Sequence, residues 1–117
     1  MISFSSLQRY YLCRGVTDMR KSFDGLSGLV SQMQGRNIFS GDVFIFLNRQ
    51  RNRMKLLVWD QSGFVIYYKR LEQGTFEMPR GESSKTEIEI AWSSLVLILE
   101  GIALASVRQR KRYKRTA

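Results

Sequence analysis

Three arginines alternate with polar residues in one short segment of the sequence. Arg49, Arg51 and Arg53 are each separated by a single polar residue, and Lys55 follows two positions later. A guanidinium group presents its N–H donors as a planar fork, which binds phosphate oxygens in pairs. The segment 48–53 has no apolar side chain for a core. We therefore expect a loop that presents positive charge to a polyanion, with nucleic acid as the first candidate.

A second group of cations lies near the C-terminus. Six of the eight residues from Arg108 to Arg115 are basic, in a chain of 117 residues with a net charge of +9. Dense charge without apolar periodicity predicts a mobile tail, 108–117, that adds mostly non-specific affinity; the alternative is charge that serves solubility alone. The predicted nucleic-acid-binding residues are Arg49, Arg51, Arg53, Lys55, Lys69, Arg70, Arg108, Arg110, Lys111, Arg112, Lys114 and Arg115.

Carboxylates that converge on metal ions would be needed for phosphoryl transfer. The candidates are Asp18, Asp24, Asp42, Asp60 and Glu72. Each has a simpler explanation, as a helix cap, a surface charge or a turn residue. No catalytic motif and no glycine-rich phosphate loop before a helix is recognisable. We therefore predict a protein that is not an enzyme, without catalytic residues, metal ligands or a cofactor.

The cysteine and histidine content limits the disulfides and metal sites that the chain can form. Cys13 is the only cysteine and histidine is absent, which excludes an internal disulfide and a Cys/His zinc site. The segment Met1–Leu12 lacks the basic and then apolar pattern of a secretory signal. These features fit a protein of a reducing cytosol.

The cationic loop must be positioned by the strands on either side of it. Three apolar, β-branched and aromatic runs predict strands at Val43–Leu47, Met54–Trp59 and Phe64–Tyr68. The segment 60–63, Asp-Gln-Ser-Gly, is typical of a hairpin turn, in which the glycine would take a positive φ. These runs predict an antiparallel meander with the arginines at the tip of its first hairpin.

A helix should precede the meander. Apolar residues recur at helical spacing, after a short strand at 10–12 and a cap at Thr17 or Asp18. Gly25 and Gly28 would let this helix approach the sheet closely, and Gly35 would end it. The residues that share its apolar face are Met19, Phe23, Leu26, Val30 and Met33.

The C-terminal part has a weaker pattern. We expect a mobile loop near 78–86, an edge strand at Glu87–Ile90, and a short helix through Leu95–Leu99 that is capped by Ser93 or Ser94 and ended by Gly101. The predicted fold is α+β: a single domain, 1–107, in which an N-terminal amphipathic helix packs on the meander, followed by a short C-terminal helix and a basic tail. The first helix would cover one face of the sheet, and the C-terminal segment or a second subunit would cover the other.

Two features of the apolar residues have alternative interpretations. Tyr67 and Tyr68 could stack on nucleic-acid bases, but alternation predicts at least one of them in the core, and Trp59 is expected to be a core residue. The apolar run 91–107 precedes basic residues, as in a membrane anchor. It is shorter than the roughly 20 residues that a span needs and contains Glu100, so we predict no membrane insertion.

Two ordered sets of motifs resemble a known family. Residues 15–21, GVTDMRK, followed by DGL at 24–26, are similar to the opening of the small TnpB accessory proteins of the bacterial insertion sequence 66 family. The meander is similar too, through Phe46-x-Asn-Arg, Lys55-Leu-Leu, Trp59-Asp, Gly63-Phe, the segment YKRLE at 68–72, Gly74 and Phe76. The resemblance covers about residues 11–79. It departs from the family pattern at Met78, where tryptophan is expected, and at Ser22, where glycine is frequent.

The resemblance implies a bacterial cytoplasmic protein, associated with the nucleoid, that is encoded beside a separate, larger transposase and needed for efficient transposition. It implies no catalytic residues, and this family is distinct from the RNA-guided nuclease that is also called TnpB. Two functions follow for the chain. One is binding of DNA, at the ends of the insertion sequence, within the transposition complex. The other is an adaptor that docks the transposase with little DNA contact of its own. A homo-oligomer is left open.

Overall fold

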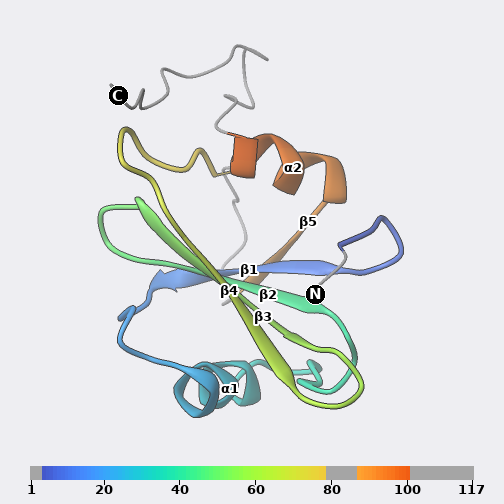
Figure 1. Ribbon diagram of the computed structural model, residues 1–117. Coiled ribbons are helices and arrows are strands. Elements are labelled where there is room, and N and C mark those ends of the chain that lie inside the picture. Colours follow the sequence, from blue (N-terminus) through green and yellow to red (C-terminus); the bar gives the residue numbers. More distant parts are fainter. Residues whose placement is uncertain (1–3, 79–86, 101–117) are drawn as a thin grey trace.

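A five-stranded mixed sheet with one helix on each face forms the fold (Figure 1). The computed structural model describes residues 4–78 and 87–100. The strand order is β4-β3-β2-β1-β5; β1 and β2 are parallel, and the other neighbours are antiparallel. The elements in chain order are β1 (Tyr10–Val16), α1 (Phe23–Ser31), β2 (Val43–Leu47), β3 (Arg53–Trp59), β4 (Phe64–Arg70), β5 (Glu87–Ile90) and α2 (Trp92–Glu100).

The predicted meander is confirmed as β2, β3 and β4. Phe44 pairs with Leu57, and Leu57 pairs with Ile66, both in antiparallel register. All five residues of β2 are buried, which explains why its sequence has no polar alternation: helices cover both faces of the sheet there. The α+β class is confirmed, but the sheet has two more strands than the meander.

The helix α1 connects the parallel strands β1 and β2, so it is not the first element of the fold. It packs on one face through Leu26 and Val30, which are fully buried. Phe23, at its first position, is 45% exposed, so its predicted place on the buried face of the helix is wrong. A Cβ at Gly28 would meet no atom within 4 Å, so the expected close approach of helix and sheet at this glycine is wrong.

The predicted start of α1 is also wrong, because the helix begins four or five residues later than a cap at Thr17 or Asp18 implies. Its N-cap is Ser22, which makes no side-chain hydrogen bond to the helix. Asp18 instead accepts a hydrogen bond from the backbone N–H of Arg20 at 2.9 Å and fixes a turn before the helix. The helix ends at Ser31, and Gly35, with a φ of +79°, lies in the following turn.

The opposite face of the sheet is covered by α2, as Figure 1 shows, through the buried Leu95 and Ile98. The prediction that the C-terminal segment covers this face is confirmed. Ser93 and Ser94 lie inside the helix, so the predicted cap is wrong. The edge strand β5 is confirmed and pairs with β1. The loop residues 79–86, the predicted stop at Gly101 and the tail lie outside the described residues.

Several aromatic side chains lie nearer the surface than their types predict. Trp59 is half-buried and forms an edge-to-face cluster with Phe39 and Phe64, at centroid distances of 5.1 and 5.0 Å. Tyr67 and Tyr68 are 38% and 47% exposed, because β4 is an edge strand. The expectation that one of these tyrosines and Trp59 belong to the core is wrong. Among residues 4–78 and 87–100, no helix has the length and apolar character needed to cross a membrane.

Candidate nucleic-acid interface

Asn48 organises the loop between β2 and β3, which carries the alternating arginines. Its side-chain oxygen accepts hydrogen bonds from the backbone N–H groups of Asn52 and Arg53, at 3.1 and 3.0 Å. Its side-chain nitrogen donates to Asn52 Oδ1 at 2.7 Å and to Gln50 Oε1 at 3.3 Å. The Asn48 side chain therefore accepts hydrogen bonds from backbone N–H groups that a tight loop would otherwise leave unpaired.

The segment that follows β4 holds the same loop from its other side. The backbone N–H of Leu71 donates to Asn52 O, and that of Phe76 donates to Arg51 O, both at 2.7 Å. Phe76 is 2% exposed, so this segment is anchored in the core. Arg51 has a φ of +57°, a left-handed conformation that this loop imposes on a non-glycine residue. The loop is a fixed platform for its arginines.

The arginines of the loop point to two different hollows rather than forming one patch. Arg49 and Arg51 are exposed, whereas Arg53 is half-buried and donates to the hydroxyl of Tyr68 at 3.2 Å. Asn48 and Arg49 line both hollows. The loop is therefore a ridge with a depression on each side.

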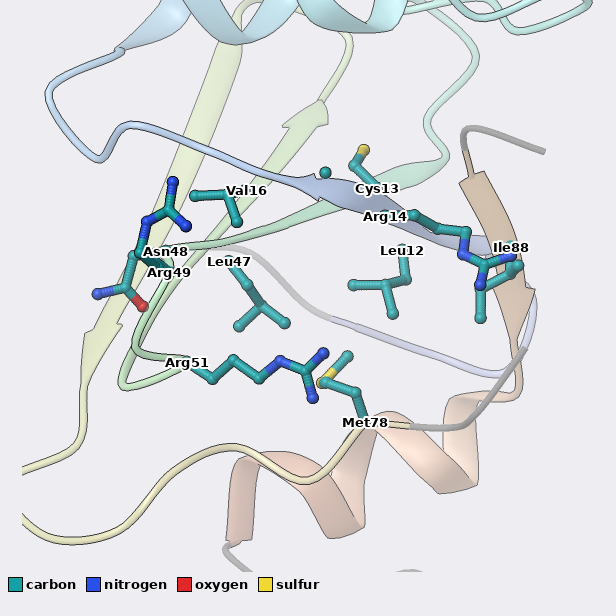
Figure 2. Close-up of a pocket in the computed structure, with 11 residues that line it drawn as sticks. Leu12, Cys13, Arg14, Val16, Leu47, Asn48, Arg49, Arg51, Met78 and Ile88 are labelled. Atoms are coloured by element: carbon teal, nitrogen blue, oxygen red, sulfur yellow. The ribbon is translucent and has the colours of Figure 1, made fainter. Parts of the chain in front are cut away.

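The first hollow, which we call the β1 cleft, has a volume of about 480 Å³. Arg49 and Arg51 border it from the loop, and Arg14 borders it from the end of β1 (Figure 2). Leu12 and Leu47 lie between the arginines in Figure 2. The remaining lining residues are Cys13, Gly15, Val16, Asn48, Met78 and Ile88.

The second hollow lies between the loop and residues 17–20, which lead into α1, and we call it the α1 groove. It has a volume of about 590 Å³ and is bordered by an ion pair. Asp18 and Arg20 lie 2.6 Å apart at their closest atoms and both border the groove. The hydrogen bonds from the Arg20 side chain and backbone lower the pKa of Asp18 to about 2, so its carboxylate is charged at neutral pH. The positive charge of Arg20 is thus already compensated within the protein.

Three of the predicted binding residues use their charges inside the protein. Lys55 is 7% exposed, and its ammonium donates to the carbonyl oxygens of Met19 and Lys21 at 2.8 and 2.7 Å. Lys69 donates to the carbonyl oxygen of Leu99 at 2.7 Å, at the C-terminal end of α2. Arg70 forms an ion pair with Glu72, with 2.7 Å between the closest atoms. These contacts engage the ammonium groups of Lys55 and Lys69 in partly buried sites, and Glu72 compensates the charge of the exposed Arg70.

The predicted tail residues Arg108, Arg110, Lys111, Arg112, Lys114 and Arg115 lie outside the described residues. Sequence reasoning missed two residues of the interface. Arg14 was not predicted as a binding residue, because it follows the short strand expected at 10–12; β1 in fact continues to Val16 through an irregularity between Leu12 and Val16. Asn48 could have been found, since asparagine after an apolar run is a turn signal.

Two of the candidate carboxylates, those of Asp60 and Asp24, lie at positions that fit a structural role. Asp60 Oδ1 accepts from the N–H groups of Ser62 and Gly63, at 3.4 and 3.2 Å, as expected for the hairpin turn. Gln61, not Gly63, takes the positive φ in this turn, at +83°. Asp24 lies in the first turn of α1. Within residues 4–78 and 87–100, no group of three or more side chains could hold a metal ion.

The end of the sheet opposite the loop between β2 and β3 carries aromatic and acidic side chains. A groove of about 490 Å³ is bordered there by Leu7, Phe39 and Trp59, together with Asp42 and Asp60. Phe39 is 55% exposed. No lysine or arginine is among the described residues that border this groove. The molecule therefore has a cationic end, at the tip between β2 and β3, and an aromatic end with two carboxylates.

Comparison with known proteins places residues 8–109 in the sequence family described as IS66 Orf2 like protein. Two relatives from Sinorhizobium fredii (strain NBRC 101917 / NGR234) are each 32% identical. "Uncharacterized protein y4hO" matches over 94 residues, 80% of each chain, and "Uncharacterized protein y4jC" matches over 79 residues, 68% of each chain. No solved structure matches the chain.

Proposed function

The chain belongs to the IS66 Orf2-like family of insertion-sequence accessory proteins, and we propose that it performs this accessory role in transposition by binding DNA. The contact surface is the loop between β2 and β3, with Arg49 and Arg51 as the phosphate ligands and Arg53 beside them. The separate transposase of the same element is the second partner, and the ends of the insertion sequence are the DNA.

The rigidity of the cationic loop is the observation that carries this proposal. The Asn48 side chain accepts two hydrogen bonds from the loop backbone and donates two to loop side chains, and the segment after β4 donates two more to loop carbonyl oxygens. A guanidinium on a fixed loop loses little conformational freedom when it binds a phosphate. Arg49 and Arg51 are exposed, and in the described residues no carboxylate pairs with them.

The proposed contact set is smaller than the set predicted from the sequence. Lys55, Lys69 and Arg70 are left out, because their side chains already bind carbonyl oxygens or a carboxylate. The basic tail, 108–117, keeps its proposed part as a source of non-specific affinity. Neither contribution involves catalysis, and the accessory protein would leave strand cleavage and joining to the transposase.

A triple substitution of Arg49, Arg51 and Arg53 by glutamine tests the proposal. Each phosphate contact releases condensed counterions, so the slope of log affinity against log salt should fall by up to about three units on duplex DNA. Fluorescence anisotropy over a range of salt concentrations measures the slope, with insertion-sequence ends compared with random sequence. Stability should fall by no more than about 1–2 kcal/mol, because Arg49 and Arg51 are exposed and Arg53 loses one hydrogen bond, to the Tyr68 hydroxyl.

Arg9→Gln is the matched control for a single substitution, Arg49→Gln. Arg9 is exposed and precedes β1, at the end of the sheet opposite the loop. Both variants remove one positive charge, but only Arg49→Gln should remove a phosphate contact and reduce the slope by about 0.9. Equal slopes for the triple variant and the wild type would contradict the proposal.

The aromatic end favours a second candidate function, that of an adaptor for the transposase. The exposed Phe39 forms a cluster with the half-buried Trp59 and Phe64 beside a groove, and aromatic side chains are enriched at protein interfaces. Phe39→Ser should then weaken transposase association while DNA binding is unchanged. An adaptor without DNA contact would show transposase binding and no salt-dependent DNA affinity in the wild type.

A further inference from the structure

We infer that the outer edge of β4 joins two copies of this chain, whose β4 strands pair antiparallel about a two-fold axis at Tyr67. Strands β4 and β5 form the two edges of the sheet (Figure 1). Pairing through β4 would merge the sheets of the two copies into one. The inference does not depend on the proposed binding of DNA, because it rests on the strand edge and not on the cationic loop.

The backbone of β4 directs the hydrogen-bonding groups of alternate residues away from β3. At one end of the β3–β4 ladder Leu71 N–H donates to Asn52 O, and at the other end Asp60 N–H donates to Gly63 O. Because an antiparallel ladder alternates, every second residue between Gly63 and Leu71 faces outward. These outward-facing residues are Phe64, Ile66, Tyr68 and Arg70. Within residues 4–78 and 87–100, no strand pairs with this side of β4.

Proteins usually protect an exposed strand edge with charge, proline, a bulge or a short strand, and β4 lacks these features. It has seven residues without proline, and its register with β3 is regular throughout. Its two cations are already engaged, since Lys69 donates to Leu99 O and Arg70 pairs with Glu72. The other edge, β5, has only four residues, of which two are glutamates. Of the two edges, β4 is therefore the one suited to pairing.

The sequence of β4 is complementary to a second copy of itself. With Tyr67 opposite Tyr67, all seven residues of the strand take part, and the outward-facing residues lie opposite one another. Phe64 then lies opposite Arg70, and Ile66 lies opposite Tyr68. No two like charges lie directly opposite, whereas a parallel pair in register would set each cation beside its own copy.

The exposed aromatic surface of β4 also favours this occupant. Tyr67 and Tyr68 are 38% and 47% exposed, although aromatic side chains contribute most when they are buried. In the paired strands Tyr67 would contact its own copy across the axis, and Tyr68 would contact Ile66 of the other copy. Aromatic pairs and aromatic–β-branched pairs are among the stabilising cross-strand contacts. One chain thus supplies both halves of the interface.

The dimer would present two cationic loops to DNA. Arg53, which ends the loop between β2 and β3, pairs with Arg70 at the C-terminal end of β4. Antiparallel pairing places these ends of the two β4 strands far from each other, so the two loops would lie at opposite ends of the shared pair. A dimer could therefore contact DNA at two points, with higher affinity than one copy has.

A pair of charged substitutions at Tyr67 tests the inference on the full-length protein. Sedimentation velocity over a range of concentrations, without DNA, should give the mass of two chains for the wild type. Tyr67→Lys and Tyr67→Glu should each be monomeric, because each sets two like charges directly opposite. An equal mixture of the two variants should dimerise again through the opposite charges. Simple loss of folding would not be repaired by mixing, and circular dichroism checks the fold of each variant.

A cross-link at the axis provides an independent measurement. Residues in a non-hydrogen-bonded antiparallel pair have Cα atoms about 4.5 Å apart, within the range that a disulfide spans. Tyr67→Cys should therefore form a disulfide-linked dimer rapidly under mild oxidation. Ser31→Cys is the control, because residue 31 is exposed at the end of α1, and it should cross-link slowly. The native Cys13 is buried in both variants.

Three results would overturn the inference. The first is a wild type that stays monomeric at every concentration, including one that forms a complex only when the transposase is added, which would assign the edge to that partner. The second is a dimer that persists unchanged in Tyr67→Lys and Tyr67→Glu. The third is equally fast cross-linking of Tyr67→Cys and Ser31→Cys.

Discussion

The ammonium of Lys55 lies 2.8 Å from the carbonyl oxygen of Met19, and this contact joins β3 to the segment before α1. The same ammonium donates to the carbonyl oxygen of Lys21 at 2.7 Å and lies 4.8 Å from the centre of the Tyr68 ring. Strand β3 and residues 19–21 are far apart in the sequence. Lys55 therefore fastens the connection between β1 and α1 to the middle of the sheet.

Substitution of Lys55 by methionine should lower stability rather than DNA affinity. Methionine keeps much of the aliphatic volume but leaves two carbonyl groups without their charged donor, at a cost of about 1.5–3 kcal/mol. Urea denaturation followed by circular dichroism measures the free energy of unfolding. Arg49→Gln should give the reverse result, with a lower salt slope and nearly unchanged stability. A Lys55→Met variant of normal stability with a reduced salt slope would make Lys55 a DNA ligand.

Cys13 should be inert in the folded protein. It is 8% exposed, and burial, helped by the negative charge of Glu87, raises the pKa of its thiol to about 12. Since the thiolate is the reactive form, iodoacetamide at pH 8 should modify Cys13 only after denaturant is added. Mass spectrometry of samples treated with and without urea measures the modification. Fast modification of the native protein would show that this edge of the sheet opens readily.

The same thiol should make stability depend on pH under alkaline conditions. The unfolded thiol ionises near pH 8.5, whereas the folded one keeps its proton until about pH 12. Between these values the folded state binds more protons, so the thiol contributes a loss of stability as pH rises. Denaturation of the wild type and of Cys13→Ala at pH 8 and pH 10 measures this component. The variant should lose less stability between the two pH values.

The strands were predictable because their sequences are short apolar runs with turn residues between them. Asp60, which accepts hydrogen bonds in its own turn, is a local signal of this kind. The parallel pairing of β1 with β2 was not predictable, since it depends on long-range packing and not on a hairpin. The same holds for the start of α1, where Asp18 was a plausible cap but bonds to a nearer N–H group.

The sequence predicted that the candidate site is a cationic loop, but not which directions its side chains take. Alternation in Arg49, Arg51 and Arg53 indicated a cationic tip, yet the same alternation sends Arg51 and Arg53 to different hollows. The role of Lys55 could not be predicted, because its partners are backbone carbonyl oxygens far away in the sequence. Sequence shows which residues carry charge, while the fold decides which charges remain available to a ligand.

Substitution of Asn48 by alanine should separate the shape of the loop from its charge. The variant loses the acceptor for two backbone N–H groups and both side-chain hydrogen bonds to Asn52 and Gln50. We expect a destabilisation of about 1–3 kcal/mol, the range for leaving buried donors unpaired. DNA affinity should also fall, because the arginines would lose conformational freedom on binding, but the salt slope should stay unchanged because every charge remains.

Asn48→Asp is the matched variant for this experiment. Its carboxylate keeps the acceptor for Asn52 and Arg53 but cannot donate, and it adds a negative charge between the arginines. Stability should therefore fall less than in Asn48→Ala, while DNA affinity should fall at least as far through repulsion of phosphate. Denaturation curves and anisotropy titrations of the two variants give both quantities. If Asn48→Ala bound DNA as tightly as the wild type despite its lower stability, the rigidity of the loop would have no part in binding.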